Sequence, residues 1–168
     1  MKVLDRYRAA LDKRYVLGFA LLCALFAYPV IDADIMHRDD LWRVISGQYA
    51  WAQHGRPMAE LVTEVITLSG PEIIDIAPFS QIVFALCLLA SFMLAQRYFQ
   101  REYDQNLALP LAVLFLNPFF LGNILYQYDA LGMGLAIAIT AAGFSLTPKF
   151  QATQFAFSVL AFVLVLAL

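Results

Sequence analysis

The stretch that decides the fold is YVLGFALLCALFAYPVI, residues 15–31, which runs directly into DADIMHRDDLWR, residues 32–43. The first part carries no charge, and its length is near the roughly 20 residues that a helix needs to cross a bilayer. The second part is dense in charged residues. Because charge is costly within hydrocarbon, we expect this part to lie at the membrane surface, where chemistry or ligand binding can take place.

Four more uncharged runs have a similar length: residues 76–96, 105–128, 130–148 and 150–168. The 168-residue chain is 62% hydrophobic and 14% charged, whereas soluble domains carry roughly 25% charged residues. Lipid offers the backbone no hydrogen-bond partners, so each run should be a helix. The sequence therefore predicts an all-α, polytopic transmembrane helical bundle with about five spans, as one domain over residues 1–168. The last run reaches the final residue, so we expect the chain to be part of a longer protein.

The distribution of lysine and arginine indicates the orientation. Eight of these residues flank the runs on one side: Lys2, Arg6, Arg8, Lys13, Arg14, Arg97, Arg101 and Lys149. Cytoplasmic loops are rich in such residues, which predicts a cytoplasmic segment over residues 1–14 and an external loop over residues 32–76. Residues 77–168 then form the remaining transmembrane helices. The first run is expected to be retained as a signal anchor.

Two short helices are expected to lie along the membrane surface within the external loop. Asp39 or Asp40 can cap a helix over residues 41–54, and Pro57 can open a second helix that runs through Thr67. Three aromatic residues of the first helix suit the headgroup zone: Trp42, Tyr49 and Trp51. Further along the chain, Pro110 and Asn117-Pro118 should break or kink the third run.

Three aspartates on the external side are candidate site residues. Asp39 and Asp40 could supply a general base or hold a divalent cation, and the alternative is a helix cap with a solvated neighbour. Asp129 precedes the next apolar run and is also a candidate site residue, with a helix cap as the alternative. We predict that the three converge on one pocket, with Arg43 or Arg56 nearby.

The external cations and aromatics are candidate substrate-binding residues. Arg43 and Arg56 could grip a phosphate, because a guanidinium matches it in a bidentate fashion, or they could pair with the nearby acids. Tyr128 could stack on a sugar or belong to the aromatic belt. The net charge of −2 and the lack of a basic stripe give no indication of a nucleic-acid partner.

Two landmarks resemble a known family. The first is Asp39-Asp40-Leu41-Trp42-Arg43, followed by Ser46-Gly47, Trp51 and Gly55-Arg56-Pro57. It is similar to the first external loop of GtrII-type glucosyltransferases, the serotype-converting enzymes of bacteria and their phages. The second is Asn117-Pro118-Phe119-Phe120, followed by Tyr126-Gln127-Tyr128-Asp129-Ala130-Leu131 and Met133, with Gln127 where the family commonly has arginine.

The resemblance implies a GT-C-like enzyme in the bacterial inner membrane. It implies transfer of glucose from a polyprenyl-phosphate donor to lipid-linked O-antigen at the periplasmic face. Asp40 or Asp39 would deprotonate the acceptor, Arg43 or Arg56 would stabilise the leaving phosphate, and Asp129 would close the pocket. Trp42 and Tyr128 would contact substrate.

Two other functions stay open at this point. One is a transporter or flippase of lipid-linked sugars, which helices interrupted at Pro110 and Pro118 would suit. A transporter needs polar groups at the membrane midplane, however, whereas the acids here cluster at one surface. The other is an inactive membrane fragment.

Overall fold

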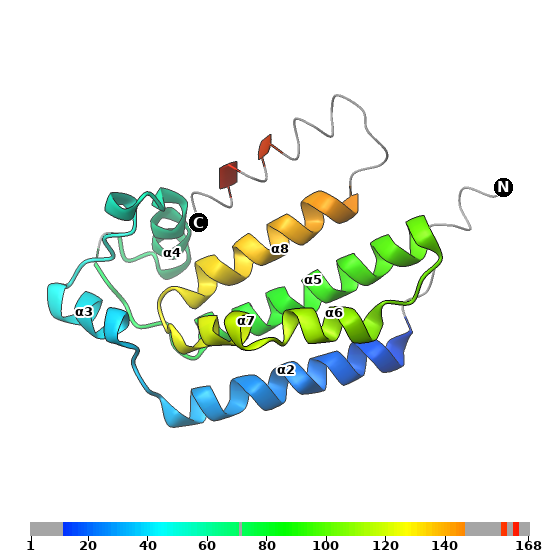
Figure 1. Cartoon of the computed structure of the whole chain (residues 1–168). Coiled ribbons are helices and arrows are strands. Elements are labelled where there is room, and N and C mark those ends of the chain that lie inside the picture. The colour runs from blue at the N-terminus through cyan, green and yellow to red at the C-terminus, as the bar shows by residue number, and fades with distance from the viewer. Residues whose placement is uncertain (1–11, 71, 147–158, 161–162, 165–168) are drawn as a thin grey trace.

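The computed structural model describes residues 12–70, 72–146, 159–160 and 163–164 (Figure 1). Apart from an isolated bridge between Gln48 and Glu72, the regular structure in these residues is helical. The predicted cytoplasmic segment, except for residues 12–14, and nearly all of the predicted fifth span lie outside the described residues.

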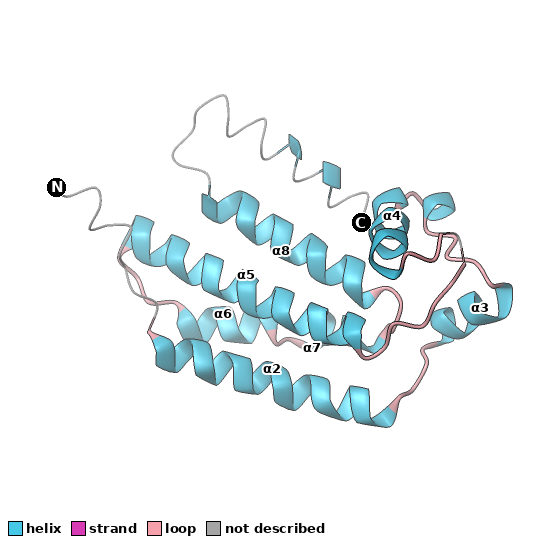
Figure 2. Ribbon diagram, turned by 180° about the vertical axis from the view of Figure 1, so that it is seen from behind, coloured by secondary structure: helices cyan, strands magenta, loops and turns pink. Residues whose placement is uncertain are grey.

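The long helical segments lie side by side and form an apolar bundle (Figures 1 and 2). In chain order they are α2 (Lys13–Ala33), α5 (Phe79–Tyr103), the consecutive α6 (Ala108–Phe115) and α7 (Pro118–Gly122), and α8 (Ala130–Leu146). Successive segments run in opposite directions. Lys13 at the start of α2 and Arg101 in the last turn of α5 therefore lie at the same end of the bundle.

Two of these helices, α2 and α5, are long and apolar enough to cross a membrane. The count rises to three if α6 and α7, bent by 41°, form one span. Helix α8 is shorter, at 17 residues. The described residues thus support two to three spans, and the five predicted from the sequence are not confirmed.

The predicted break at Asn117-Pro118 is confirmed. The Asn117 side chain accepts hydrogen bonds from the backbone N–H groups of Phe119 and Phe120, at 2.8 and 3.2 Å, and Pro118 takes the first position of α7. The prediction of a break at Pro110 was wrong. Pro110 lies in the first turn of α6, where its missing N–H has no intrahelical partner to lose.

Close contacts hold the bundle together. The Phe19 ring of α2 stacks on Phe92 of α5, with centroids 4.2 Å apart. Gly134 allows α8 to approach α5, because a Cβ at this position would lie 2.9 Å from the Cα of Phe84. Small residues serve this purpose at helix contacts in membranes. Cys23 and Cys87 are buried in the bundle as free thiols.

The remaining elements gather at the other end of the bundle, which we call the polar end (residues 34–70, 72–78 and 123–129). They are α3 (Arg38–Ser46), η1 (Ala52–His54), α4 (Pro57–Thr67) and η2 (Asn123–Leu125). The bounds predicted for α4 are confirmed. Both ends of the preceding helix were predicted wrongly.

Local geometry explains the two errors in α3. Its N-cap is His37, whose Nδ1 accepts the N–H of Asp39 at 3.4 Å, so neither aspartate is the cap. The helix ends at Ser46 because Gly47 takes a left-handed conformation (φ 68°) and donates its N–H to the carbonyl of Arg43. The chain then leaves the helix before Tyr49 and Trp51, which frees both side chains to turn inward.

Candidate active site

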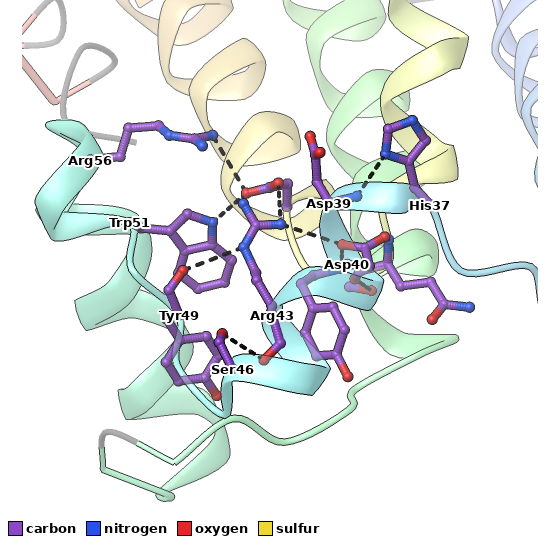
Figure 3. Close-up of polar contacts among 12 residues, drawn as sticks. His37, Asp39, Asp40, Arg43, Ser46, Tyr49, Trp51 and Arg56 are labelled. Atoms are coloured by element: carbon purple, nitrogen blue, oxygen red, sulfur yellow. Dashed lines mark hydrogen bonds and ion pairs between the residues drawn. The ribbon is translucent and has the colours of Figure 1, made fainter.

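A buried ion cluster, formed by Asp40, Arg43 and Asp129, joins α3 to the connector (residues 126–129) that precedes α8. Asp40 is 0% exposed, and Arg43 and Asp129 are each 6% exposed. The Nη1 atom of Arg43 lies 2.8 Å from Oδ2 of Asp129 and 3.5 Å from Oδ1 of Asp40 (Figure 3). Arg43 thus bridges two carboxylates from segments far apart in the sequence.

Helix α3 positions the first half of this cluster. Asp40 and Arg43 are three residues apart on it and therefore share one helical face. The end of the helix at Ser46 turns the chain back, so that the carbonyl of Tyr49 accepts a hydrogen bond from Nε of Arg43 at 3.4 Å. The guanidinium also lies over the Trp51 ring, 5.2 Å from its centroid. Arg43 is thus held on several sides.

Asp129 collects three donors. Its Oδ1 atom accepts a hydrogen bond from the Trp51 indole and lies 3.4 Å from Nη1 of Arg56, and its Oδ2 atom pairs with Arg43. The Arg56 side chain is 31% exposed, which makes it the most accessible of the four charged groups. Two arginines and two aspartates balance in charge, as a buried cluster requires.

Asp40 binds the connector rather than the start of its own helix. Its Oδ2 atom accepts the backbone N–H of Gln127 at 2.8 Å, and its Oδ1 atom accepts that of Tyr128 at 3.4 Å. Burial raises the pKa of Asp40 above its usual value, and Asp129 adds to the rise. The two N–H groups and Arg43 act in the opposite direction without cancelling it.

Gln127 links the connector to two bundle helices. Its side-chain Nε2 donates to Oδ1 of Asp34, at the end of α2, at 3.0 Å. Its carbonyl accepts a hydrogen bond from the hydroxyl of Ser80, in the first turn of α5. The sequence analysis missed Ser80 as a site residue, and nothing local in the sequence separates it from other serines near helix starts.

An aromatic cluster supports the ion cluster. Tyr49 stacks on Trp51, with centroids 4.8 Å apart, and Tyr128 and Ala59 complete this buried group. Placing Tyr49 and Trp51 in the headgroup zone was therefore wrong, because both face the protein. Burial, followed by the charge of Asp75, raises the pKa of Tyr128 to about 12, so its phenol stays neutral.

The structure separates the sequence-predicted residues into two groups. It brings together Asp40, Arg43, Arg56 and Asp129, with Tyr128 beside them. It leaves Asp39 and Trp42 exposed on other sides of α3. Two of the three aspartates, Asp40 and Asp129, thus come together on Arg43, whereas the shared pocket and the catalytic roles stay predictions.

The divalent cation that the sequence analysis considered has no matching group of ligands in the described part of the chain. There, no three or more histidine, cysteine, aspartate or glutamate side chains are arranged to hold a metal ion. The guanidinium of Arg43 supplies the positive charge between Asp40 and Asp129.

Comparisons with known proteins agree with these landmarks. The family model for glucosyl transferase GtrII matches residues 28–168. An uncharacterised 55.3 kDa protein in the gtrB 5′ region of Salmonella phage P22 is 28% identical over 130 residues, or 77% of this chain. The chain spans about a quarter of that relative's length, 26%. No solved structure matches. Because the family model covers most of the sequence, including the ion cluster, the chain belongs to the GtrII glucosyl transferase family.

Proposed function

We propose that this chain forms the catalytic end of a membrane glucosyltransferase. The enzyme moves glucose from a polyprenyl-phosphate donor to lipid-linked O-antigen at the periplasmic face of the bacterial inner membrane, and its N-terminus is cytoplasmic. The observation that carries the proposal is the buried Asp40–Arg43–Asp129 cluster at one end of an apolar bundle. Membership of the GtrII family supports the same reaction class.

Exposure separates the roles of the two neighbouring aspartates. A general base must touch the acceptor hydroxyl, and Asp39 is exposed whereas Asp40 is 0% exposed with both oxygens engaged. We therefore assign the base to Asp39. Asp40 is a positioning residue, because it fixes the connector that carries Asp129 relative to α3.

The two arginines divide in the same way. Arg43 is enclosed by carboxylates and an indole ring, so its charge is used to neutralise Asp40 and Asp129. Arg56 is partly exposed and has a long contact to Asp129, 3.4 Å. A phosphate can bind this guanidinium in place of Asp129 with little rearrangement of the protein. We assign the leaving phosphate to Arg56, and contact with the lipid part of the donor to the exposed ring of Trp42.

The proposed reaction is a single displacement. The acceptor oxygen forms a bond to the anomeric carbon of glucose as the bond from that carbon to the phosphate oxygen breaks. The acceptor proton goes to the Asp39 carboxylate. The polyprenyl phosphate leaves with the bonding electrons, and its growing charge is stabilised by Arg56.

Transfer of labelled glucose from polyprenyl-phosphate-glucose to acceptor lipid tests the proposal in the full protein that contains this chain. Asp39→Asn should lower turnover by roughly 10²–10⁴-fold, the usual contribution of a general base. Asp32→Asn, which removes another exposed carboxylate from the same region, should leave turnover near normal. Equal activity of both variants would remove Asp39 from catalysis, and an inactive wild type would contradict the transferase itself.

Transport of lipid-linked sugars is the second candidate, favoured by the 41° bend between α6 and α7. The buried carboxylates Asp40 and Asp129 lie at the polar end rather than midway along the bundle, which favours the transferase. Vesicles that move a labelled lipid-linked sugar between leaflets, without glucose transfer, would support the transporter.

A further inference from the structure

Helix α3 has its polarity reversed relative to a surface helix of a soluble protein. Such a helix buries its apolar face and exposes its charged residues. In α3, Asp40 and Arg43 are buried. Its exposed side chains include four large apolar ones: Leu41, Trp42, Val44 and Ile45. Ile45 is the most exposed of these, at 77%. The outer surface of α3 thus carries four large apolar side chains, although the helix lies outside the bundle, and Arg38 and Asp39 are its exposed charged residues.

Helix α3 follows α2 in the chain, and lipid can surround the exposed apolar side chains of α2. Helix α2 is a candidate membrane span, and its side chains are mostly exposed in the structure. The segment that joins it to α3 exposes Ile35 and Met36. Ile35 and Met36 are thus exposed apolar side chains between the end of the span and α3, with the exposed polar residues Asp34 and Arg38 on either side of them. The same membrane that surrounds α2 is the environment within reach of α3.

Length and charge fix how α3 can meet that membrane. Nine residues of helix extend about 14 Å, which is far short of the roughly 30 Å hydrocarbon core. Helix α3 therefore cannot cross. Arg38, exposed in its first turn, offers a positive charge to lipid phosphates. The exposed Trp42 ring, 55% accessible, suits the boundary between headgroups and acyl chains.

We propose that the outer face of α3, formed by Leu41, Trp42, Val44 and Ile45, docks into the headgroup–acyl boundary of the membrane that α2 crosses. The inner face then holds the Asp40–Arg43 pair at a fixed depth, just outside the hydrocarbon. The docking stands whether or not the chain transfers glucose, because it rests on burial and polarity alone.

The two tryptophans of the chain provide the test. Trp42 is exposed and Trp51 is 1% exposed, so quenchers in the lipid should act mainly on Trp42. The full chain is reconstituted in vesicles of phosphatidylcholine and phosphatidylglycerol that carry bromine either near the headgroup or near the chain end. Emission should fall most with bromine near the headgroup. Trp42→Phe, which leaves Trp51 as the sole tryptophan, should remove most of this depth-dependent quenching.

Two variants separate docking from other causes. Ile45→Glu places a charge on the outer face of α3 and should weaken quenching by the brominated lipids. Leu68→Glu changes an apolar side chain after α4 that is even more exposed, at 88%, and it should leave the quenching unchanged. Unchanged quenching in Ile45→Glu would overturn the proposal.

Two further results would also overturn it. Strong quenching of Trp42 by aqueous iodide, with no response to brominated lipid, would place α3 in water. Protection of Trp42 from both quenchers would show that protein covers this face, either a segment of a longer chain or a second copy.

Discussion

The two ends of the bundle handle charge in opposite ways. At the polar end, Asp40, Arg43 and Asp129 are buried and paired across distant segments. At the opposite end, cations such as Lys13 and Arg97 are exposed. The Arg101–Glu102 pair there joins neighbours in the sequence, and both of its side chains are partly exposed, at 22% and 25%.

The difference between the two ends shows which charges constrain the packing of the protein. Exposed cations keep their hydration, so they constrain orientation in a membrane without constraining packing. A buried ion loses its hydration and persists only where partners surround it. The polar end is therefore the part of the molecule in which sequence changes should have large and specific effects.

The largest expected effect concerns membrane orientation and is all-or-none. Gln53 lies exposed at the polar end, and Gln105 lies exposed at the opposite end. An impermeant maleimide should label Gln53→Cys in intact cells, and it should label Gln105→Cys only after permeabilisation, because we propose that the end with the exposed cations is cytoplasmic. The reverse pattern would invert the orientation and place the ion cluster on the cytoplasmic side.

Breaking the buried cluster should have the next largest effect. Asp129→Asn preserves shape but leaves two arginines short of a counter-charge, so the free energy of unfolding should fall by about 3–5 kcal/mol. Glu102→Gln removes the partly exposed pair at the other end and should change it by about 0–1 kcal/mol. Unfolding of both variants in detergent measures the contrast. If both variants lost a similar free energy of unfolding, burial of an ion pair would not determine how much it stabilises the protein.

Packing within the bundle gives a smaller effect. Gly134→Ala adds a Cβ 2.9 Å from the Cα of Phe84, so α5 and α8 must separate, at a cost of about 1–3 kcal/mol. Gly122→Ala adds the same methyl where nothing lies within 4 Å, and it should be neutral or stabilising. The same unfolding assay compares them. If Gly134→Ala were as stable as the wild type, α5 and α8 would separate more easily than the 2.9 Å distance indicates.

The smallest expected effect is on pH dependence. Burial raises the pKa of Asp40 in the folded state. A raised carboxyl pKa contributes stability that is complete below the unfolded value of about 3.9 and is lost as pH rises through the folded value. Relative to Asp40→Asn, the wild type should therefore become less stable as pH rises across this window. Parallel pH profiles for the two proteins, measured by thermal unfolding in detergent, would contradict this.

Local patterns in the sequence predicted much of the fold. The first uncharged run became α2, Pro57–Thr67 became α4, and the turn at Asn117-Pro118 broke the third run. The reason is that hydropathy, caps and proline act within a few residues along the chain. The same locality made the family landmarks recognisable, and the family is confirmed.

The errors arose where distant segments decided the outcome. Trp51 was expected at the headgroups but donates to Asp129. Asp40 was one of two candidate helix caps, yet its carboxylate accepts the N–H groups of Gln127 and Tyr128. No window of sequence contains both partners of these contacts, so no local pattern could have predicted them.

The sequence by itself determined that this protein is an apolar helical bundle with its acids concentrated at one end, and that it carries the landmarks of the GtrII family. Only the tertiary structure decided which of those charges are buried, so that Asp40 differs from Asp39 and Arg43 differs from Arg56. The physical reason is that composition fixes how many charges a chain has. The free energy of each charge depends on solvent and partners, which the packing of remote segments supplies.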